Sequence, residues 1–210
     1  MFVGNAMTRQ VKTVSPDAAL GSVWETMQAG GYEAIPVRDG RRNLVGMVTA
    51  FDIAAQILSG READSVRQMK VAEVMTTEVA GISEDEILEE AAAIMYRNDY
   101  YALPVIADNG VLVGIITQAD VGRMFVEMMG FTQPGSRITM VAPDRTGVLA
   151  EIAQIIKSCA VSISSMATLV QEDRTMANVI VRLKTDQPRD VVERLRHAGY
   201  RVLHVSQVWE

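Results

Sequence analysis

The chain has little of what extracellular and metal-bound proteins rely on. Its 210 residues include a single cysteine, Cys159, which can form neither an internal disulfide nor a cysteine-rich zinc site. No apolar run approaches the roughly 20 residues of a membrane-spanning helix. The opening residues, MFVGNAMTRQ, lack the basic and apolar regions of a secretory signal. These absences predict a soluble, cytoplasmic protein with no membrane partner.

Clustered positive charge is also scarce. Residues 137–210 contain 10 Lys/Arg and 8 Asp/Glu, whereas residues 1–136 contain 10 and 18, so the net charges are +2 and -8. A surface that tracks nucleic-acid phosphates needs clustered lysine and arginine. We therefore expect no nucleic-acid partner.

Recognisable catalytic patterns are missing as well. The sequence contains no supported Ser-His-Asp set, no metal-ligand cluster and no Walker-type phosphate loop. These absences predict that the chain is not an enzyme.

What the sequence does contain is an internal repeat. Residues 2–58 align without a gap to residues 70–126, with 17 identities in 57 positions. Each copy ends in a similar apolar run, LVGMVTAFD at 44–52 and LVGIITQAD at 112–120. We expect two copies of one unit, each ordered strand, helix, strand, strand, helix.

The last third of the chain has a different element order. Residues 137–142 read as a strand, and the following loop leads into an amphipathic helix. Two strands joined by QEDR, a helix closed by glycine and a final strand complete a βαββαβ order. This order predicts a ferredoxin-like unit, with two helices on one face of a four-stranded antiparallel sheet.

These patterns resemble two known families. The repeat, with MT near its start, Y-x-A-[IL]-P-V in its middle and L-V-G-x-[VI]-T-x-x-D at its end, resembles a tandem pair of CBS domains. Residues 137–207, with VAPDRTGVLAEI at the first strand-to-helix turn, resemble an ACT domain. The order is similar to that of acetoin-utilisation type regulatory proteins. The resemblance implies an α+β fold, with a pseudo-twofold CBS pair and a C-terminal ferredoxin-like ACT domain. We expect CBS repeats at 1–66 and 67–129, a linker at 130–136 and the ACT domain at 137–210.

The CBS resemblance implies two ligand clefts between the repeats. An adenine nucleotide (AMP, ADP or ATP) or S-adenosylmethionine would bind there as a regulatory ligand. In the favoured cleft, Asp120 would accept ribose hydroxyls, Thr117 would donate to a phosphate, Thr13 would add a hydroxyl, and the backbone at Glu33 and Ala34 would frame the adenine.

The second cleft would use the equivalent positions 68 residues away. These positions are Thr49, Asp52, Gly81, Tyr101 and Ala102. Because Gly81 stands where the first copy has Thr13, this cleft would lack one hydroxyl and is the weaker candidate.

Two alternatives remain open for these polar residues. A threonine at a helix start, with an acidic residue three positions later, is also a helix-capping signature that needs no ligand. Arg38, Arg41 and Arg42 follow the AIPV segment, where they would either reach phosphates or lie in a solvated turn.

The ACT resemblance implies a second kind of site. A small amino or carboxylic acid would bind at the turn formed by Asp144, Arg145, Thr146 and Gly147, where backbone N–H groups meet a carboxylate. The alternative is an ACT domain that only dimerises.

Together these expectations predict a non-catalytic ligand sensor that forms a homodimer or higher homo-oligomer and regulates an enzyme. The first alternative is a scaffold that dimerises or docks onto an enzyme without binding nucleotide. The second is an adenine-nucleotide-dependent enzyme.

Overall fold

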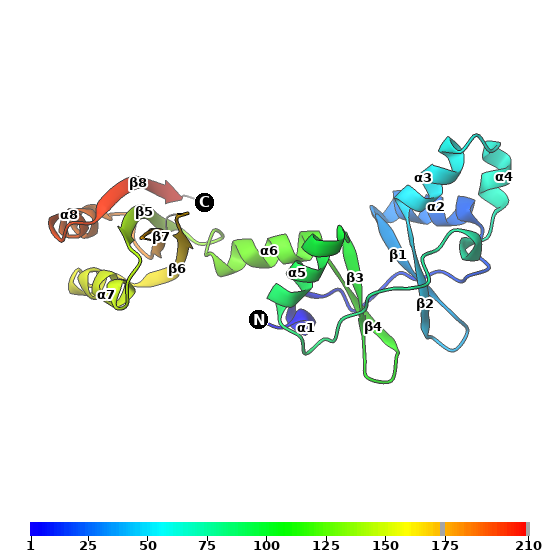
Figure 1. Ribbon diagram of the computed structural model, residues 1–210, viewed down its shortest axis with the longest axis horizontal. Helices are drawn as coiled ribbons and strands as arrows, with labels where there is room; N and C mark the ends of the chain where they lie inside the picture. The colour runs from blue at the N-terminus through cyan, green and yellow to red at the C-terminus, as the bar shows by residue number, and fades with distance from the viewer. Residues whose placement is uncertain (173–174, 209–210) are drawn as a thin grey trace. The chain divides into compact units, whose positions relative to one another are not determined.

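The computed structural model describes residues 1–172 and 175–208. The chain divides into two compact units (Figure 1). The repeat unit is Met1–Gly122, and the C-terminal unit is Arg123–Glu210.

The repeat unit contains two copies of a helix followed by a β-hairpin and a second helix. In the first copy these elements are α2 (Leu20–Gly30), β1 (Ala34–Arg38), β2 (Leu44–Thr49) and α3 (Ala50–Leu58). In the second copy they are α5 (Leu88–Asn98), β3 (Ala102–Ile106), β4 (Leu112–Thr117) and α6 (Gln118–Met128). The short helices α1 (Val3–Ala6), α4 (Ala63–Gln68) and η1 (Val71–Glu73) complete the unit.

Helix α2 shows why these segments fold as the sequence predicts. Leu20, Val23 and Met27 recur at helical spacing and are buried, so one face of the helix packs into the core of the first copy. The helix ends at Gly31, whose left-handed φ of 65° suits a residue without a Cβ. Helix α5 ends in the same way at Asp99.

The prediction of a strand at the start of each copy is wrong. In the described structure these segments form isolated bridges instead of a strand, and the parallel ones join Val14 with Val37 and Ile82 with Val105. Val14 N–H donates to the carbonyl of Pro36, and Arg38 N–H donates to the carbonyl of Val14. A longer parallel ladder would next require an N–H from Pro36, which proline lacks. Pro36 therefore ends the ladder at Val14.

The two copies exchange their first residues. Thr8 forms both backbone hydrogen bonds of a bridge with Ile115 of β4, at 2.9 and 3.0 Å. Thr76 bonds in the same way to Met47 of β2, at 2.9 Å in each direction. Each hairpin is therefore completed by the chain segment that begins the other copy.

Glycine in each LVG sequence permits this exchange. A Cβ on Gly46 would lie 2.8 Å from the Thr76 carbonyl oxygen and 2.8 Å from the Met75 sulfur. A Cβ on Gly114 would overlap the side chain of Met7. Both glycines provide the space for the crossing segment to lie against the hairpin.

The C-terminal unit has the predicted ferredoxin-like order. Its elements are β5 (Gly135–Pro143), α7 (Val148–Ser158), β6 (Ile163–Val170), β7 (Met176–Leu183), α8 (Arg189–His197) and β8 (Arg201–Val208). The antiparallel sheet has the order β6-β7-β5-β8. Ile138 of β5 and Val181 of β7 belong to the same buried core as Ile152 of α7 and Leu195 of α8. Both helices therefore pack on one face of the sheet, and the α+β prediction is confirmed.

The segment expected to be a linker packs within the C-terminal unit. Just before this segment, the carbonyl of Met129 accepts a hydrogen bond from Ser165 Oγ at 2.8 Å. The carbonyl of Gln133 accepts one from Arg182 Nη1 at 3.3 Å. The guanidinium of Arg182 also lies 4.7 Å from the ring centroid of Phe131, and Arg182 is buried. Strand β5 begins at Gly135, two residues before the expected start.

We predict that Gly46→Ala destabilises the repeat unit. The new Cβ meets the Thr76 carbonyl, a backbone atom that cannot rotate away, so the free energy of unfolding should fall by about 1–3 kcal/mol. Urea denaturation followed by circular dichroism measures this loss. Gly40→Ala is the matched control, because a Cβ there meets nothing within 4 Å. Equal stability of the two variants would contradict the proposed role of Gly46.

Candidate functional site: two related clefts

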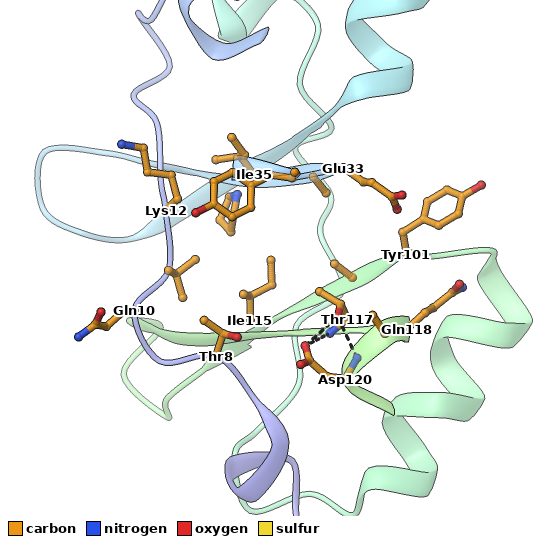
Figure 2. A pocket seen from close by; sticks show the side chains of 17 residues that line it. Thr8, Gln10, Lys12, Glu33, Ile35, Tyr101, Ile115, Thr117, Gln118 and Asp120 are labelled. Atoms are coloured by element: carbon orange, nitrogen blue, oxygen red, sulfur yellow. Dashed lines mark hydrogen bonds between the residues drawn. The ribbon is translucent and has the colours of Figure 1, made fainter. Parts of the chain in front are cut away.

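The repeat unit contains a cleft between the two copies, here called cleft A (Figure 2). Its volume is about 390 Å³. The first copy contributes residues near the N-terminus and at the start of β1, and the second copy contributes the end of β4 and the start of α6. The polar and charged residues that line it are Thr8, Gln10, Lys12, Tyr32, Glu33, Tyr101, Thr117, Gln118 and Asp120.

A second cleft, cleft B, also has a volume of about 390 Å³. Its polar and charged lining residues are Thr49, Asp52, Thr76, Glu78, Asp99, Tyr100 and Tyr101, and Phe51 adds an exposed aromatic ring. Shifting the lining of cleft A by 68 residues reproduces most of this set. The two clefts are therefore repeat-related versions of one site, and Ala34, Tyr101 and Ala102 line both.

The Thr-x-x-Asp sequences form capping boxes at the helix starts. Thr49 Oγ1 accepts a hydrogen bond from the backbone N–H of Asp52 at 3.1 Å. In return, Asp52 Oδ2 accepts hydrogen bonds from the Thr49 hydroxyl at 2.7 Å and from the Thr49 backbone N–H at 2.8 Å. Thr117 and Asp120 repeat this pattern, with distances of 3.1, 2.7 and 3.0 Å. The capping interpretation is therefore correct for both copies.

This geometry also orients the aspartates. Each carboxylate uses Oδ2 for the cap, and each aspartate lines its cleft. Capping and ligand binding are thus compatible for Asp52 and Asp120. The hydroxyl protons of Thr49 and Thr117 already have carboxylate acceptors, which differs from the expectation that they are donated to a phosphate.

The free edge of each hairpin faces its cleft. Backbone groups of successive strand residues point to alternate sides. Since the Pro36 carbonyl and the Arg38 N–H bond to Val14, the N–H and C=O of Ala34 point to that same side, away from β2. Because Pro36 ends the pairing of β1 with Val14, no further strand of the described chain pairs with the backbone N–H and C=O of Ala34 on this side. Ala34 also lines the cleft. The same argument applies to Ala102 with Pro104 and Ile82.

Thr13 and Gly81 do not line the clefts. The described lining of cleft A passes from Gln10, Val11 and Lys12 to Gly31. The absence of a side chain at Gly81 has a packing reason, because a Cβ there would overlap the side chain of Ile106. Thr13 and Gly81 therefore do not give the two described linings the expected difference of one hydroxyl.

The three arginines also lie outside both described linings. Arg38, Arg41 and Arg42 belong to the end of β1 and its turn. Asp39 organises this turn by accepting from Asn43 N at 2.9 Å and Arg41 N at 2.8 Å. The hydrogen bond from the Asn43 backbone is the main reason that the pKa of Asp39 is lowered. The solvated-turn interpretation fits this arrangement better than phosphate contact.

Several lining residues were missed by sequence reasoning. Thr8 and Thr76 belong to Met-Thr pairs that recur 68 residues apart, and this recurrence was a visible signal. Gln10, Lys12 and Glu78 had no such signal, because their residue types differ between the copies. They become lining residues only because the first segments remain outside the sheet.

The turn of the C-terminal unit is braced by an ion pair. Arg145 donates to both carboxylate oxygens of Glu151, at 2.9 and 2.8 Å, and Tyr200 donates its hydroxyl to Glu151 at 2.9 Å. These hydrogen bonds, that from Arg145 first, lower the pKa of Glu151. Gly147 precedes α7 with a φ of 88°. Asp144, Thr146 and Gly147 are exposed, whereas Arg145 is already engaged by Glu151.

Other site types find no support in the described residues. Within residues 1–172 and 175–208, no group of three or more His, Cys, Asp or Glu side chains could hold a metal ion. Over the same residues, no helix combines the length and apolarity needed to cross a membrane.

Comparison with protein families now identifies the modules. The CBS domain model matches residues 3–59 and 71–127, the two copies of the repeat. The chain belongs to the CBS-domain family. A model described as a TTHA0829-like ACT domain matches residues 134–206. The chain therefore carries a tandem CBS pair followed by an ACT domain, as the sequence predicted.

Curated relatives match mainly this CBS pair. The CBS domain-containing protein YhcV of Bacillus subtilis is 33% identical over 67% of this chain and 94% of its own length. An inosine-5'-monophosphate dehydrogenase of Methanocaldococcus jannaschii is 35% identical over 54% of this chain, but the match spans only 21% of that enzyme. CBS pairs similar to this one thus also occur as parts of enzymes.

Solved structures agree with this assignment. A putative acetoin utilization protein, AcuB, from Vibrio cholerae has a TM-score of 0.57 and 28% identity, covering 63% of this chain and 95% of its own. CBSX2, solved in complex with AMP, has a TM-score of 0.52 and 25% identity, covering 60% and 96%. The CBS-pair protein CBSX2 from Arabidopsis thaliana has a TM-score of 0.53 and 25% identity, covering 60% of this chain and 94% of its own.

We predict that Thr49→Ala destabilises the apo protein. The change removes the acceptor for Asp52 N and should lower the free energy of unfolding by about 1 kcal/mol. Thr49→Ser keeps an Oγ at this position and is the matched control. Denaturant melts without ligand measure both variants, and a Thr49→Ala protein as stable as the serine variant would contradict the capping role.

We also predict an acid-sensitive contribution from Glu151. Its pKa is lowered by folding, so the unfolded chain binds the proton more readily. The stabilisation by Arg145 is therefore present above the ordinary glutamate pKa of 4.5 and is lost as pH falls through the folded pKa. Glu151→Gln should remove this part of the pH dependence. A stability difference between the two proteins that stays constant from pH 7 to acid would count against it.

Proposed function

We propose that this protein is a non-catalytic regulatory sensor that binds an adenosyl ligand between its CBS repeats. The observation that carries the proposal is cleft A, whose lining brings together Asp120 of one copy and Ala34 at the free strand edge of the other. Glu33 and Ile35, which flank Ala34 in the chain, lie across the cleft from Asp120 (Figure 2). The AMP complex of the similar protein CBSX2 supports the choice of ligand class.

The strand edge suits an adenine base. The N–H and C=O of Ala34 point toward the cleft side of β1, so they offer one donor and one acceptor at adjacent positions. Adenine presents a ring-nitrogen acceptor beside an amino donor, which matches this pair. Exposed Tyr32 supplies aromatic surface next to the edge.

The capped aspartate suits a ribose. A carboxylate is an acceptor with two oxygens, and the cap of Asp120 fixes its orientation before any ligand arrives. Thr8, Gln10 and Lys12 lie on the segment that crosses the cleft and would contact the 5' substituent. Lys12 is the one cation in the described lining.

A sensor requires that the ligand favour one arrangement of the chain. The clefts take their walls from both repeats, so a bound ligand would change the free energy of one repeat placement relative to another. In the same proposal, a small amino or carboxylic acid binds at residues 144–147 of the ACT domain. A cytoplasmic location stays a prediction that rests on the single Cys159.

Calorimetric titration of the full chain with AMP tests this function. We expect saturable binding that Asp120→Asn weakens by about 10- to 100-fold, because a hydrogen bond to a charged group contributes about 1.5–3 kcal/mol. Asp108→Asn is the matched control, since Asp108 is exposed in the turn of the same repeat and lies outside both described linings. No heat with AMP, ADP, ATP or S-adenosylmethionine would reject the sensor function.

The alternative is a scaffold that dimerises or docks onto an enzyme. Exposed apolar side chains on α3 favour it, since Leu58 is 85% exposed, Phe51 77% and Ile57 51%. Such side chains commonly belong to interfaces. A concentration-independent dimer in light scattering that Leu58→Glu converts to monomer, together with no adenosyl binding, would favour the scaffold.

A further inference from the structure

We propose that the two clefts select ligands of opposite charge. Cleft A takes a phosphorylated adenine nucleotide, and cleft B takes an adenosyl compound whose 5' substituent is neutral or cationic. This inference rests on the proposed function, since it presumes that both clefts bind adenosyl groups. It follows from residue types that differ between otherwise repeat-related walls.

Cleft A contains a cation at the crossing segment. Lys12 lines it beside Gln10, and the lysine side chain is exposed on a flexible stem at the side of the cleft where Gln10 also lies (Figure 2). In the part of the chain that the structure describes, no carboxylate pairs with Lys12. Its ammonium is therefore available to a phosphate. Gln118 also lines the cleft, but its Nε2 already donates to the carbonyl of Tyr100 at 3.1 Å.

Cleft B reverses this charge. Ala80 stands where cleft A has Lys12, and Glu78 stands where it has Gln10. Asp52 and Asp99 bring the described carboxylates of cleft B to three, and no lysine or arginine occurs in its described lining. Cleft A has two carboxylates, Glu33 and Asp120, beside its lysine. A phosphate in cleft B would meet like charge without a counter-ion.

The apolar wall of cleft B differs in a complementary way. Phe51 replaces Ala119 and is 77% exposed. Tyr101 occupies the position of Glu33 but lines both clefts, so Phe51 is the aromatic residue that distinguishes cleft B from cleft A. Aromatic faces attract cations and contact thioether groups favourably. In cleft B, a 5' sulfonium or thioether would therefore meet the ring of Phe51, which the described lining of cleft A lacks, and a sulfonium would also meet three carboxylates.

In this proposal the repeat unit binds a phosphorylated adenine nucleotide in cleft A and a neutral or cationic adenosyl compound in cleft B, so it responds to the concentrations of both. Ala34, Tyr101 and Ala102 line both, so a ligand in one cleft would contact residues that also line the other. Binding at the two sites is thermodynamically coupled wherever the ligands prefer different placements of these residues.

Calorimetry of the full chain with ATP, S-adenosylmethionine and 5'-methylthioadenosine tests the assignment. We expect one ATP site, weakened by Asp120→Asn but not by Asp52→Asn, and one S-adenosylmethionine site with the reverse pattern. Lys12→Ala should weaken ATP by about 3- to 10-fold and leave S-adenosylmethionine unchanged. Saturation with one ligand should leave the site of the other available.

A charge exchange in cleft B provides the gain-of-function arm. The double change Ala80→Lys with Glu78→Gln gives cleft B the residues of cleft A at these two exposed positions. It should create a second ATP site and weaken S-adenosylmethionine by about tenfold. Matching circular dichroism melts of all variants exclude unfolding as the cause.

The outcomes separate the two proposals. ATP filling both clefts of the wild-type chain equally, or S-adenosylmethionine binding that depends on Asp120 rather than Asp52, would overturn the charge selection and leave the sensor function intact. Absence of binding by every adenosyl ligand would overturn both. Unchanged ATP affinity in Lys12→Ala would also reject the role given to Lys12.

Discussion

The structure of the CBS pair depends on two reciprocal backbone bridges. Thr8 pairs with Ile115 and Thr76 pairs with Met47, so each repeat lends its first residues to the hairpin of the other. The bridges require close backbone approach, which Gly46 and Gly114 permit. Because neither hairpin has a third strand of its own, the repeats are completed only as a pair. The clefts are a consequence, since the crossing segments form part of their walls.

Proline then determines where those segments leave the sheet. The missing N–H of Pro36 ends the pairing with Val14, and Pro104 occupies the same position beside Ile82. The residues before Val14 therefore line a cleft instead of joining a ladder. The missing proline N–H thus leaves one backbone edge of the hairpin unpaired. It also leaves the side chains that differ between the repeats, such as Lys12 and Ala80, in the lining of the clefts.

The Thr-x-x-Asp boxes place helix-capping aspartates in the lining of the two clefts. Each aspartate caps a helix through Oδ2, and the cap orients the carboxylate at the cleft. A preoriented acceptor loses little conformational freedom when a ligand binds. The duplicated boxes are nearly identical, so they cannot distinguish the two clefts. The surrounding residues that diverged between repeats, above all Lys12 against Ala80 and Gln10 against Glu78, supply the difference.

Sequence reasoning reached much of this architecture because local patterns carry it. The 68-residue repeat, the helical spacing of Leu20, Val23 and Met27, and the βαββαβ order were sufficient for the α+β fold and its modules. Thr49, Asp52, Thr117 and Asp120 could be selected because their spacing has a local chemical meaning. The roles of Thr13, Gly81 and the strand at the start of each copy could not be judged in this way.

Tertiary contacts decided those remaining features. Gly81 is small because Ile106 packs against it, and the ladder stops at Val14 because Pro36, far along the chain, has no N–H to donate. Lys12 and Glu78 became cleft residues through the same long-range pairing. The sequence by itself determined the modules and the capping boxes, since both depend on neighbours along the chain. Only the folded structure decided which side chains share a cleft, since that depends on which backbone edges remain unpaired.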